Sequence, residues 1–135
     1  MNKKTRSLMK YIIEVNEIQV INFHADEVET DKGIMVVVNG KLDLIIKDYF
    51  LPVMLTYIEN IKTSLIFDLQ QVDYLDSSGL SLILKCSKAL KQKNLTLHTV
   101  LKPGSQADRI FKLSQTDKQI NRLYSIDELP DIEKG

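Results

Sequence analysis

The chain has 135 residues, 44% hydrophobic and 27% charged, a length and composition typical of one soluble domain with its own core. Lysine plus arginine equals aspartate plus glutamate at 18 each, so no net charge favours nucleic acid or an anionic membrane as a partner. A single cysteine excludes an intramolecular disulfide and a cysteine-based metal cluster, and only two histidines argue against a zinc site.

Neither a membrane span nor an export signal is expected. No apolar run approaches the roughly 18 residues that a membrane span needs. After the basic start, the apolar run covers only residues 11–13 before Glu14, which is too short for a signal peptide. We therefore expect a cytoplasmic protein that does not insert into a membrane.

The N-terminal segment is basic and contains little that could be buried. Residues 1–10 carry four basic side chains, and we expect residues 1–14 to be a mobile N-terminal extension. One domain is then predicted over residues 15–135, because the rest of the chain has no linker, repeat or low-complexity tract.

Two strands are predicted after this extension. Alternation of apolar and polar residues around Ile18 and Val20 indicates the first strand. The acidic stretch HADEVETDKG, residues 24–33, is predicted to be a turn or loop. The following IMVVVNG, residues 34–40, is rich in β-branched residues and predicts the second strand.

The pattern then changes to alternating helices and strands. Apolar residues at helical spacing follow residue 48, and Pro52 places the helix start close to Asp48, because proline is tolerated only near a first turn. The apolar run SLIFDL, residues 64–69, is typical of a central strand covered on both faces. A second helix is predicted from near Ser78 to about Gln92.

The C-terminal part continues this alternation. LTLHTV, residues 95–100, predicts a strand, and Ser105 with Asp108 forms a capping pattern that opens a third helix. QINRLY, residues 119–124, predicts the last strand, and a short helix follows Ser125. The order β-β-α-β-α-β-α-β-α predicts an α/β fold, with helices packed on a mixed, mainly parallel sheet.

The stretch Asp76-Ser77-Ser78-Gly79 lies between two apolar runs and has three interpretations. A serine hydrolase would need a base for Ser77, and His98 is the candidate, but the nucleophile elbow G-x-S-x-G is absent. No glycine-rich nucleotide motif is present either, so we predict no catalysis and no cofactor or metal. We expect Cys86 to be a buried small hydrophobe on a helix.

The second interpretation is a helix cap, formed by Asp76 or Ser77. Gly79 would cost roughly 1 kcal/mol relative to alanine inside a helix, which suggests that another surface approaches this first turn closely. The third interpretation is phosphorylation, with a phosphate on Ser77 lying at the positive end of the helix dipole near free amides. The carboxylate of Asp76 would oppose that gain by charge repulsion.

The helix after this motif has an apolar arc wider than a helix on a sheet needs. Either another helix covers the excess, or Leu80 and Leu84 are partly exposed beside Ser77 for a binding partner. The sequence alone leaves both possibilities open.

Three segments resemble the STAS-domain family, specifically the bacterial anti-sigma factor antagonists. They are GKLD at 40–43, LIFDLQQVDYLDSSGLSLIL at 65–84 and RIFKLSQT at 109–116, and the resemblance covers roughly residues 18–129. It implies a STAS fold and a cycle with two partner enzymes. An anti-sigma factor serine kinase phosphorylates the antagonist, which binds that kinase when unphosphorylated, and a serine phosphatase restores it.

The resemblance also implies roles for individual residues. Ser77 would be the phosphoacceptor, with Ser78 as the less favoured position. Asp43 would contact the kinase and its nucleotide, Asp76 would flank the acceptor, and Ser78 with Gly79 would complete the docking surface.

The chain departs from the family pattern in two places. Ile45, Ile46 and Lys47 follow GKLD where small residues are usual, and SQTDKQI lacks the usual glycine before the last strand. We therefore expect a phosphorylation-switched binding protein that sequesters an anti-sigma factor kinase while Ser77 is unmodified. The alternatives are a non-switching scaffold or regulatory subunit, in a stress-signalling or lipid-transport complex, and, more remotely, a serine hydrolase.

Overall fold

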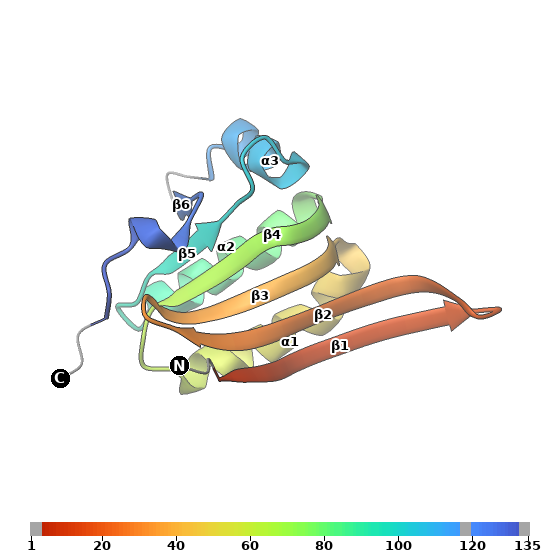
Figure 1. Ribbon diagram of the computed structural model, residues 1–135, viewed down its shortest axis with the longest axis horizontal. Helices are drawn as coiled ribbons and strands as arrows, with labels where there is room; N and C mark the ends of the chain where they lie inside the picture. Colours follow the sequence, from red (N-terminus) through yellow and green to blue (C-terminus); the bar gives the residue numbers. More distant parts are fainter. Residues whose placement is uncertain (1–3, 117–119, 133–135) are drawn as a thin grey trace.

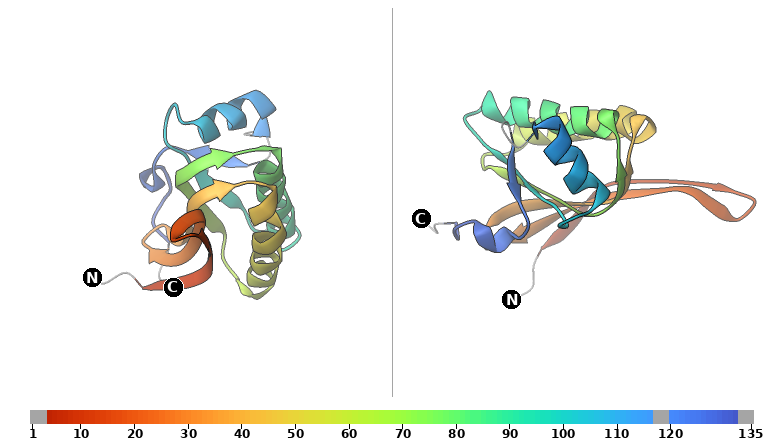
Figure 2. Two further views of the ribbon diagram at one scale, coloured as in Figure 1. Left: turned by 90° about the vertical axis from the view of Figure 1, so that its right-hand side faces the viewer. Right: turned by 90° about the horizontal axis from the view of Figure 1, so that it is seen from above.

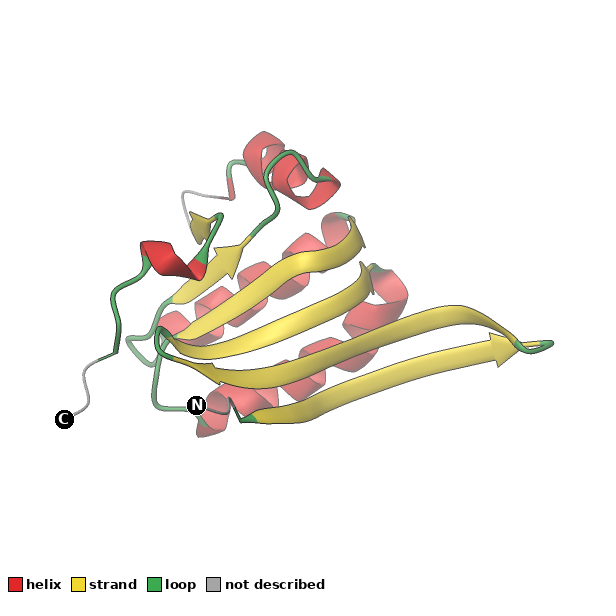
Figure 3. Ribbon diagram, viewed as in Figure 1, coloured by secondary structure: helices red, strands yellow, loops and turns green. Residues whose placement is uncertain are grey.

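The computed structural model describes residues 4–116 and 120–132, and these form one mixed α/β sheet with helices packed against it (Figures 1 and 3). The strands lie in the order β1-β2-β3-β4-β5-β6. The first two pairings are antiparallel and the other three are parallel, which confirms the predicted fold class. The strands are β1 (Thr5–Val15), β2 (Ile18–Thr30), β3 (Gly33–Leu42), β4 (Leu65–Leu75), β5 (Leu97–Val100) and β6 (Asn121–Leu123).

The helices α1 (Leu44–Asn60) and α2 (Ser77–Lys91) lie side by side on one face of the sheet (Figure 2). The main core lies between them and the sheet, and it includes Cys86, whose burial raises the pKa of its thiol to about 12. The short helix α3 (Gln106–Ser114) packs near β4. On the opposite face, the single turn η2 (Ile126–Glu128) covers a small second apolar cluster.

The N-terminal region differs from its prediction. Residues 5–14, which the sequence assigned to a mobile extension, belong to β1, and most of the predicted loop over residues 24–33 belongs to β2. The hairpin turns at Asn16 and Glu17, both with positive φ as a two-residue hairpin requires. Within β2, Asp26 alternates with buried Phe23 and Ala25 and so lies on the open face of the sheet. Glu27 lies on the helix side, where it accepts a hydrogen bond from the Tyr57 hydroxyl of α1.

The start of α1 also differs from its prediction. The helix begins at Leu44, before the predicted start at Asp48, because Asp43 caps it: its Oδ1 accepts a hydrogen bond of 3.1 Å from the Ile46 amide. Pro52 therefore lies inside the helix. Its exposed position explains why it is tolerated, since water can replace the backbone hydrogen bond that proline cannot make.

β4 is longer than predicted, because it runs from Leu65 to Leu75 and the predicted strand ended at residue 69. The other elements agree with the prediction to within a few residues. The predicted capping pattern at Ser105 is present, with Ser105 Oγ accepting from the Asp108 amide at 3.2 Å. Ser125 and Glu128 form a complete capping box at η2. The last strand is shorter than predicted, and the first residue of its predicted range, residue 119, lies outside the described residues.

Candidate functional site

Two strand-to-helix junctions meet at one edge of the sheet. β3 and β4 are parallel neighbours, and Leu42 pairs with Leu75 at their carboxyl ends. The next residue in each strand is an aspartate that caps a helix: Asp43 caps α1 and Asp76 caps α2. The register thus brings together two of the residues predicted for the site, although they are far apart in the sequence.

Asp76, rather than Ser77, caps α2. Its Oδ1 accepts hydrogen bonds from the Ser78 amide at 2.9 Å and from the Gly79 amide at 3.0 Å. The carboxylate therefore already occupies two of the amides that a phosphate on Ser77 could have used. Ser77 is the first residue of the helix and is exposed, whereas Ser78 is half-buried.

Gly79 is needed for packing inside the domain. It is buried, and a β-carbon at this position would clash with the carbonyl oxygen of Leu42 and come within 2.7 Å of a methyl carbon of Leu75. The close approach that the glycine suggests is therefore made by the end of the neighbouring strand β3. The amide of Asp76 donates to the same Leu42 carbonyl at 3.3 Å, which holds the two junctions together.

Gln106, the first residue of α3, stabilises the second junction, between β4 and α2, through the backbone of Leu75. Its Nε2 donates to the Leu75 carbonyl at 2.7 Å, and its Oε1 accepts from the Leu75 amide at 2.9 Å. Sequence reasoning missed this residue, because no motif or periodicity links a glutamine to a backbone 31 residues away. Its place directly after a helix cap is the only local signal.

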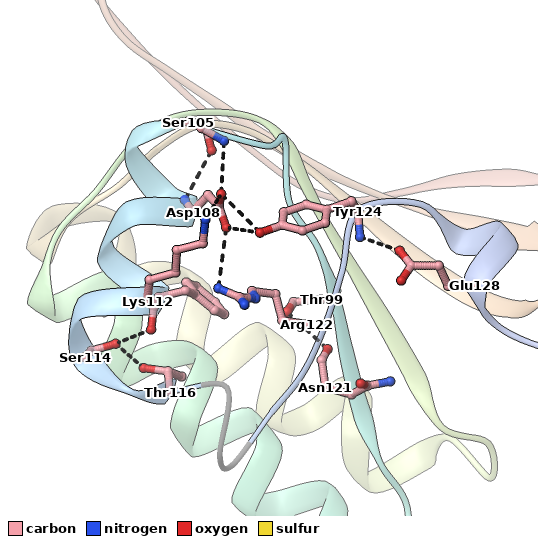
Figure 4. Close-up of polar contacts among 12 residues, drawn as sticks. Thr99, Ser105, Asp108, Lys112, Ser114, Thr116, Asn121, Arg122, Tyr124 and Glu128 are labelled. Carbon is pink, nitrogen blue, oxygen red and sulfur yellow. Dashed lines mark hydrogen bonds and ion pairs between the residues drawn. The ribbon is translucent and has the colours of Figure 1, made fainter.

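A buried ion-pair cluster fixes α3 to β6 and so supports Gln106 (Figure 4). The carboxylate of Asp108 accepts from the Gly104 amide at 3.0 Å and the Tyr124 hydroxyl at 3.0 Å, and lies 3.4 Å from Lys112 Nζ and 3.7 Å from Arg122 Nη1. Burial alone would raise the pKa of Asp108. The hydrogen bonds and the Lys112 charge outweigh burial and hold the pKa below its usual value.

The wide apolar arc of α2 is covered in part by α1. Leu80 and Leu84 are half-buried and pack against the main core, and Lys47 Nζ of α1 donates to Ser81 Oγ at 3.3 Å. The sequence left open whether another helix covers these leucines or a binding partner does, and the structure shows only partial cover by α1. Part of both leucine side chains remains accessible on the same helix as Ser77.

Exposed apolar side chains flank the two aspartates. Leu44 and Ile45 at the start of α1 are 58% and 51% exposed, and Tyr74 at the end of β4 is 43% exposed. A pocket of about 420 Å³ lies beside Asp43, between the end of β3 and the facing part of β2. This edge therefore combines accessible hydroxyl, carboxylate and apolar groups, a composition suited to binding another protein.

The geometry rules out a catalytic pair of Ser77 and His98. His98 pairs with Ile66 near the start of β4, whereas Ser77 follows the end of that strand, about 30 Å away at the usual rise per residue. The Nδ1 of His98 lies 2.8 Å from Asn121 Nδ2, and burial lowers the pKa of the imidazole. The described residues contain no group of three or more side chains that could hold a metal ion.

No helix in the described part of the chain is long and apolar enough to cross a bilayer.

Comparisons with known proteins agree with the observed fold. A family model described as the STAS domain matches residues 25–128. A crystal structure of an anti-sigma factor antagonist from Mycobacterium paratuberculosis aligns with a TM-score of 0.66 and 18% identity, over 89% of this chain and 88% of that one. No curated protein matches the sequence.

Two structures of one further protein, SpoIIAA, are also similar. The anti-sigma factor antagonist SpoIIAA in its unphosphorylated form has a TM-score of 0.56 and 16% identity, with 89% of this chain and 92% of that one covered. The structure of its phosphorylated form, described as a Bacillus cell fate determinant, has a TM-score of 0.53 and 18% identity, with 89% of this chain and 96% of that one covered. At these identities the likeness concerns the fold alone.

Proposed function

The chain belongs to the STAS domain family, and from this premise we propose that it is an anti-sigma factor antagonist whose binding is switched by phosphorylation of Ser77. Unmodified, it sequesters an anti-sigma factor serine kinase. That kinase phosphorylates Ser77 and thereby releases itself, and a serine phosphatase reverses the change. The chain itself acts by binding and not by catalysis. The observation that carries the proposal is an exposed serine hydroxyl at the shared edge of the two capped junctions.

Accessibility favours Ser77 over Ser78 as the acceptor. A kinase must bring the hydroxyl to the γ-phosphate of ATP, and the exposed Ser77 can be reached without unfolding the helix, whereas Ser78 is half-buried. Asp43 lies at the neighbouring junction and is half-buried by its cap. We assign it to the surface that the kinase contacts.

The position of Asp76 supports a switch that acts on the interface and not on the fold. Because its carboxylate already caps the helix, a phosphate on Ser77 gains little from the Ser78 and Gly79 amides and is repelled by the adjacent negative charge. The phosphate is therefore directed toward solvent, where the partner would dock. Burying it there unpaired would cost several kcal/mol of binding free energy.

The apolar groups of the same edge supply the binding energy in this proposal. Exposed Leu44, Ile45 and Tyr74 surround the aspartates, and the accessible parts of Leu80 and Leu84 extend the surface along α2. Gly79 contributes indirectly, because the close contact with Leu42 sets the spacing of the two junctions.

The test is to incubate the protein with ATP and candidate anti-sigma factor kinases and to measure its intact mass. We expect one added phosphate in the wild type and in Ser78→Ala, and none in Ser77→Ala. Calorimetry should then show that the unmodified protein binds the kinase and that the phosphorylated protein binds at least tenfold more weakly. Phosphate on Ser77→Ala would move the acceptor elsewhere. Tight binding without any phosphate would favour the scaffold function instead.

A further inference from the structure

The β1–β2 hairpin forms an arm that projects beyond the rest of the sheet (Figure 1). β1 is the edge strand of the sheet order, so no described strand pairs with its outer side. The family model begins at residue 25, after β1 and the adjoining part of β2. An unpaired edge strand of 11 residues is a ready template for pairing with another chain.

The half of β1 next to the hairpin turn exposes large apolar side chains. Ile12, Ile13 and Val15 are 49%, 36% and 53% exposed. Proteins usually protect an exposed edge strand with charges, prolines or bulges, and they seldom leave such apolar groups clustered on it. A second polypeptide segment packed along this strand would therefore remove apolar surface from water.

Residues 9–15 of β1 form a regular strand. Its pairing with β2 has two irregularities, of which the first skips Leu8 in β1 and the second skips Val20 in β2, opposite Ile13 and Glu14. No extra residue therefore falls within residues 9–15 themselves. Their side chains alternate between the two faces of the sheet. The ring of Tyr11 stacks on Tyr49 of α1 at 4.6 Å, which places the odd-numbered residues on the helix side.

The segment is self-complementary when it is paired with itself in the antiparallel direction. With a twofold axis at Ile12, Lys10 lies opposite Glu14 of a second copy, and this charge pair occurs twice. On the helix side, Met9 lies opposite Val15 and Tyr11 opposite Ile13, so apolar groups meet apolar groups. Moving the axis to Tyr11 or Ile13 would instead place Ile12 opposite a charged side chain.

We propose that two copies of this chain associate through β1, with residues 9–15 of each strand paired antiparallel about Ile12. The two six-stranded sheets then form one continuous sheet, and each copy supplies the missing partners for the other's edge. β1 is separated from β4 by two strands, so the Ser77 edge stays accessible. The inference is independent of the phosphorylation switch.

Charge reversal tests both the contact and its register. Sedimentation velocity over a wide concentration range should show a monomer–dimer equilibrium for the wild type. Lys10→Glu and Glu14→Lys each place like charges opposite one another at both symmetric positions, so each should raise the dimer dissociation constant about tenfold or more. Both side chains are exposed, and circular dichroism should confirm unchanged folding.

Complementary reversals should restore the contact. The double variant Lys10→Glu/Glu14→Lys should dimerise like the wild type, and an equimolar mixture of the two single variants should form a heterodimer. Lys85→Glu, an exposed lysine on α2, is the matched control and should leave the equilibrium unchanged. A wild-type protein that stays monomeric, or a dimer that neither single reversal weakens, would overturn the proposal.

Discussion

The β3–α1 and β4–α2 junctions share one construction and differ in the side chains that they present. In each, an aspartate directly follows the strand and caps the next helix, and the two strands are in register. After its cap the first junction has Leu44, Ile45 and Ile46, and the second has Ser77, Ser78 and Gly79. The comparison shows that one backbone arrangement can display either an apolar contact or a modifiable hydroxyl.

The two junctions also differ in how tightly they are held. Asp43 accepts one helix amide and Asp76 accepts two. The third position after the cap is buried in both, but Ile46 fills its space with a side chain, whereas at Gly79 the neighbouring backbone fills it. Only the second junction is also held by Gln106. The candidate acceptor thus lies at the more constrained of the two.

The largest expected effect tests this difference at the third position. Gly79→Ala should lower the free energy of unfolding by about 3 kcal/mol, because the new methyl group meets the Leu42 carbonyl and Leu75. Urea unfolding measures it. Ser78→Ala, one residue earlier on the same turn, is the matched control and should cost less than about 1 kcal/mol. An alanine variant as stable as the wild type would contradict the packing described for Gly79.

Removing the support that only the second junction has should have the next largest effect. Gln106→Ala leaves the amide and carbonyl of buried Leu75 without these partners and should cost about 2 kcal/mol. Hydrogen exchange of the Leu75 amide should accelerate in the variant, while that of Leu42 changes little. Gln92→Ala, at an exposed glutamine, serves as the control. Equal acceleration at Leu42 and Leu75 would show that the two junctions are not supported separately.

The two caps can be compared directly by removing each carboxylate. Asp76→Ala should destabilise the domain by about 1.5 kcal/mol and Asp43→Ala by about 1 kcal/mol, because the first loses two hydrogen bonds and the second loses one. Chemical denaturation of both variants under one condition gives the difference. A larger loss at Asp43 would reverse the order of the two junctions.

The last prediction concerns the effect of acid on Asp108, whose contacts support the second junction through α3. At neutral pH no loss of stability is expected from this group. The folded-state pKa of Asp108 is lowered, so its stabilisation is fully present above the unfolded value near 3.8 and is lost as pH falls through the folded value. Below pH 3.8 the free energy of unfolding of the wild type should fall more steeply than that of Asp108→Asn. Parallel slopes in acid would show that Asp108 does not cause the pH dependence.

The sequence predicted the α/β class, the mainly parallel pairings and the helices α1, α2, α3 and η2, because periodicity, strand–helix alternation and capping residues are local signals. It could not decide whether Asp76 or Ser77 caps α2, since both carry a suitable oxygen and only the backbone geometry selects one. The acidic residues of β2 suggested a loop because Glu27 and Glu29 lie on the same face as buried Phe23 and Ala25, so the apolar–polar alternation of a half-buried strand breaks off after Ala25. Gln106 was missed because its partners are backbone groups of a distant strand.

The main chain of Leu42 links the two junctions of the candidate site. Its carbonyl accepts from the Asp76 amide and limits residue 79 to glycine, and Asp43 follows it directly. An engineer who wished to graft the serine turn into another domain could not transplant residues 76–79 alone. The end of β3 would have to be moved with them, together with a glutamine on the far side, so the smallest portable unit comes from three separate parts of the chain.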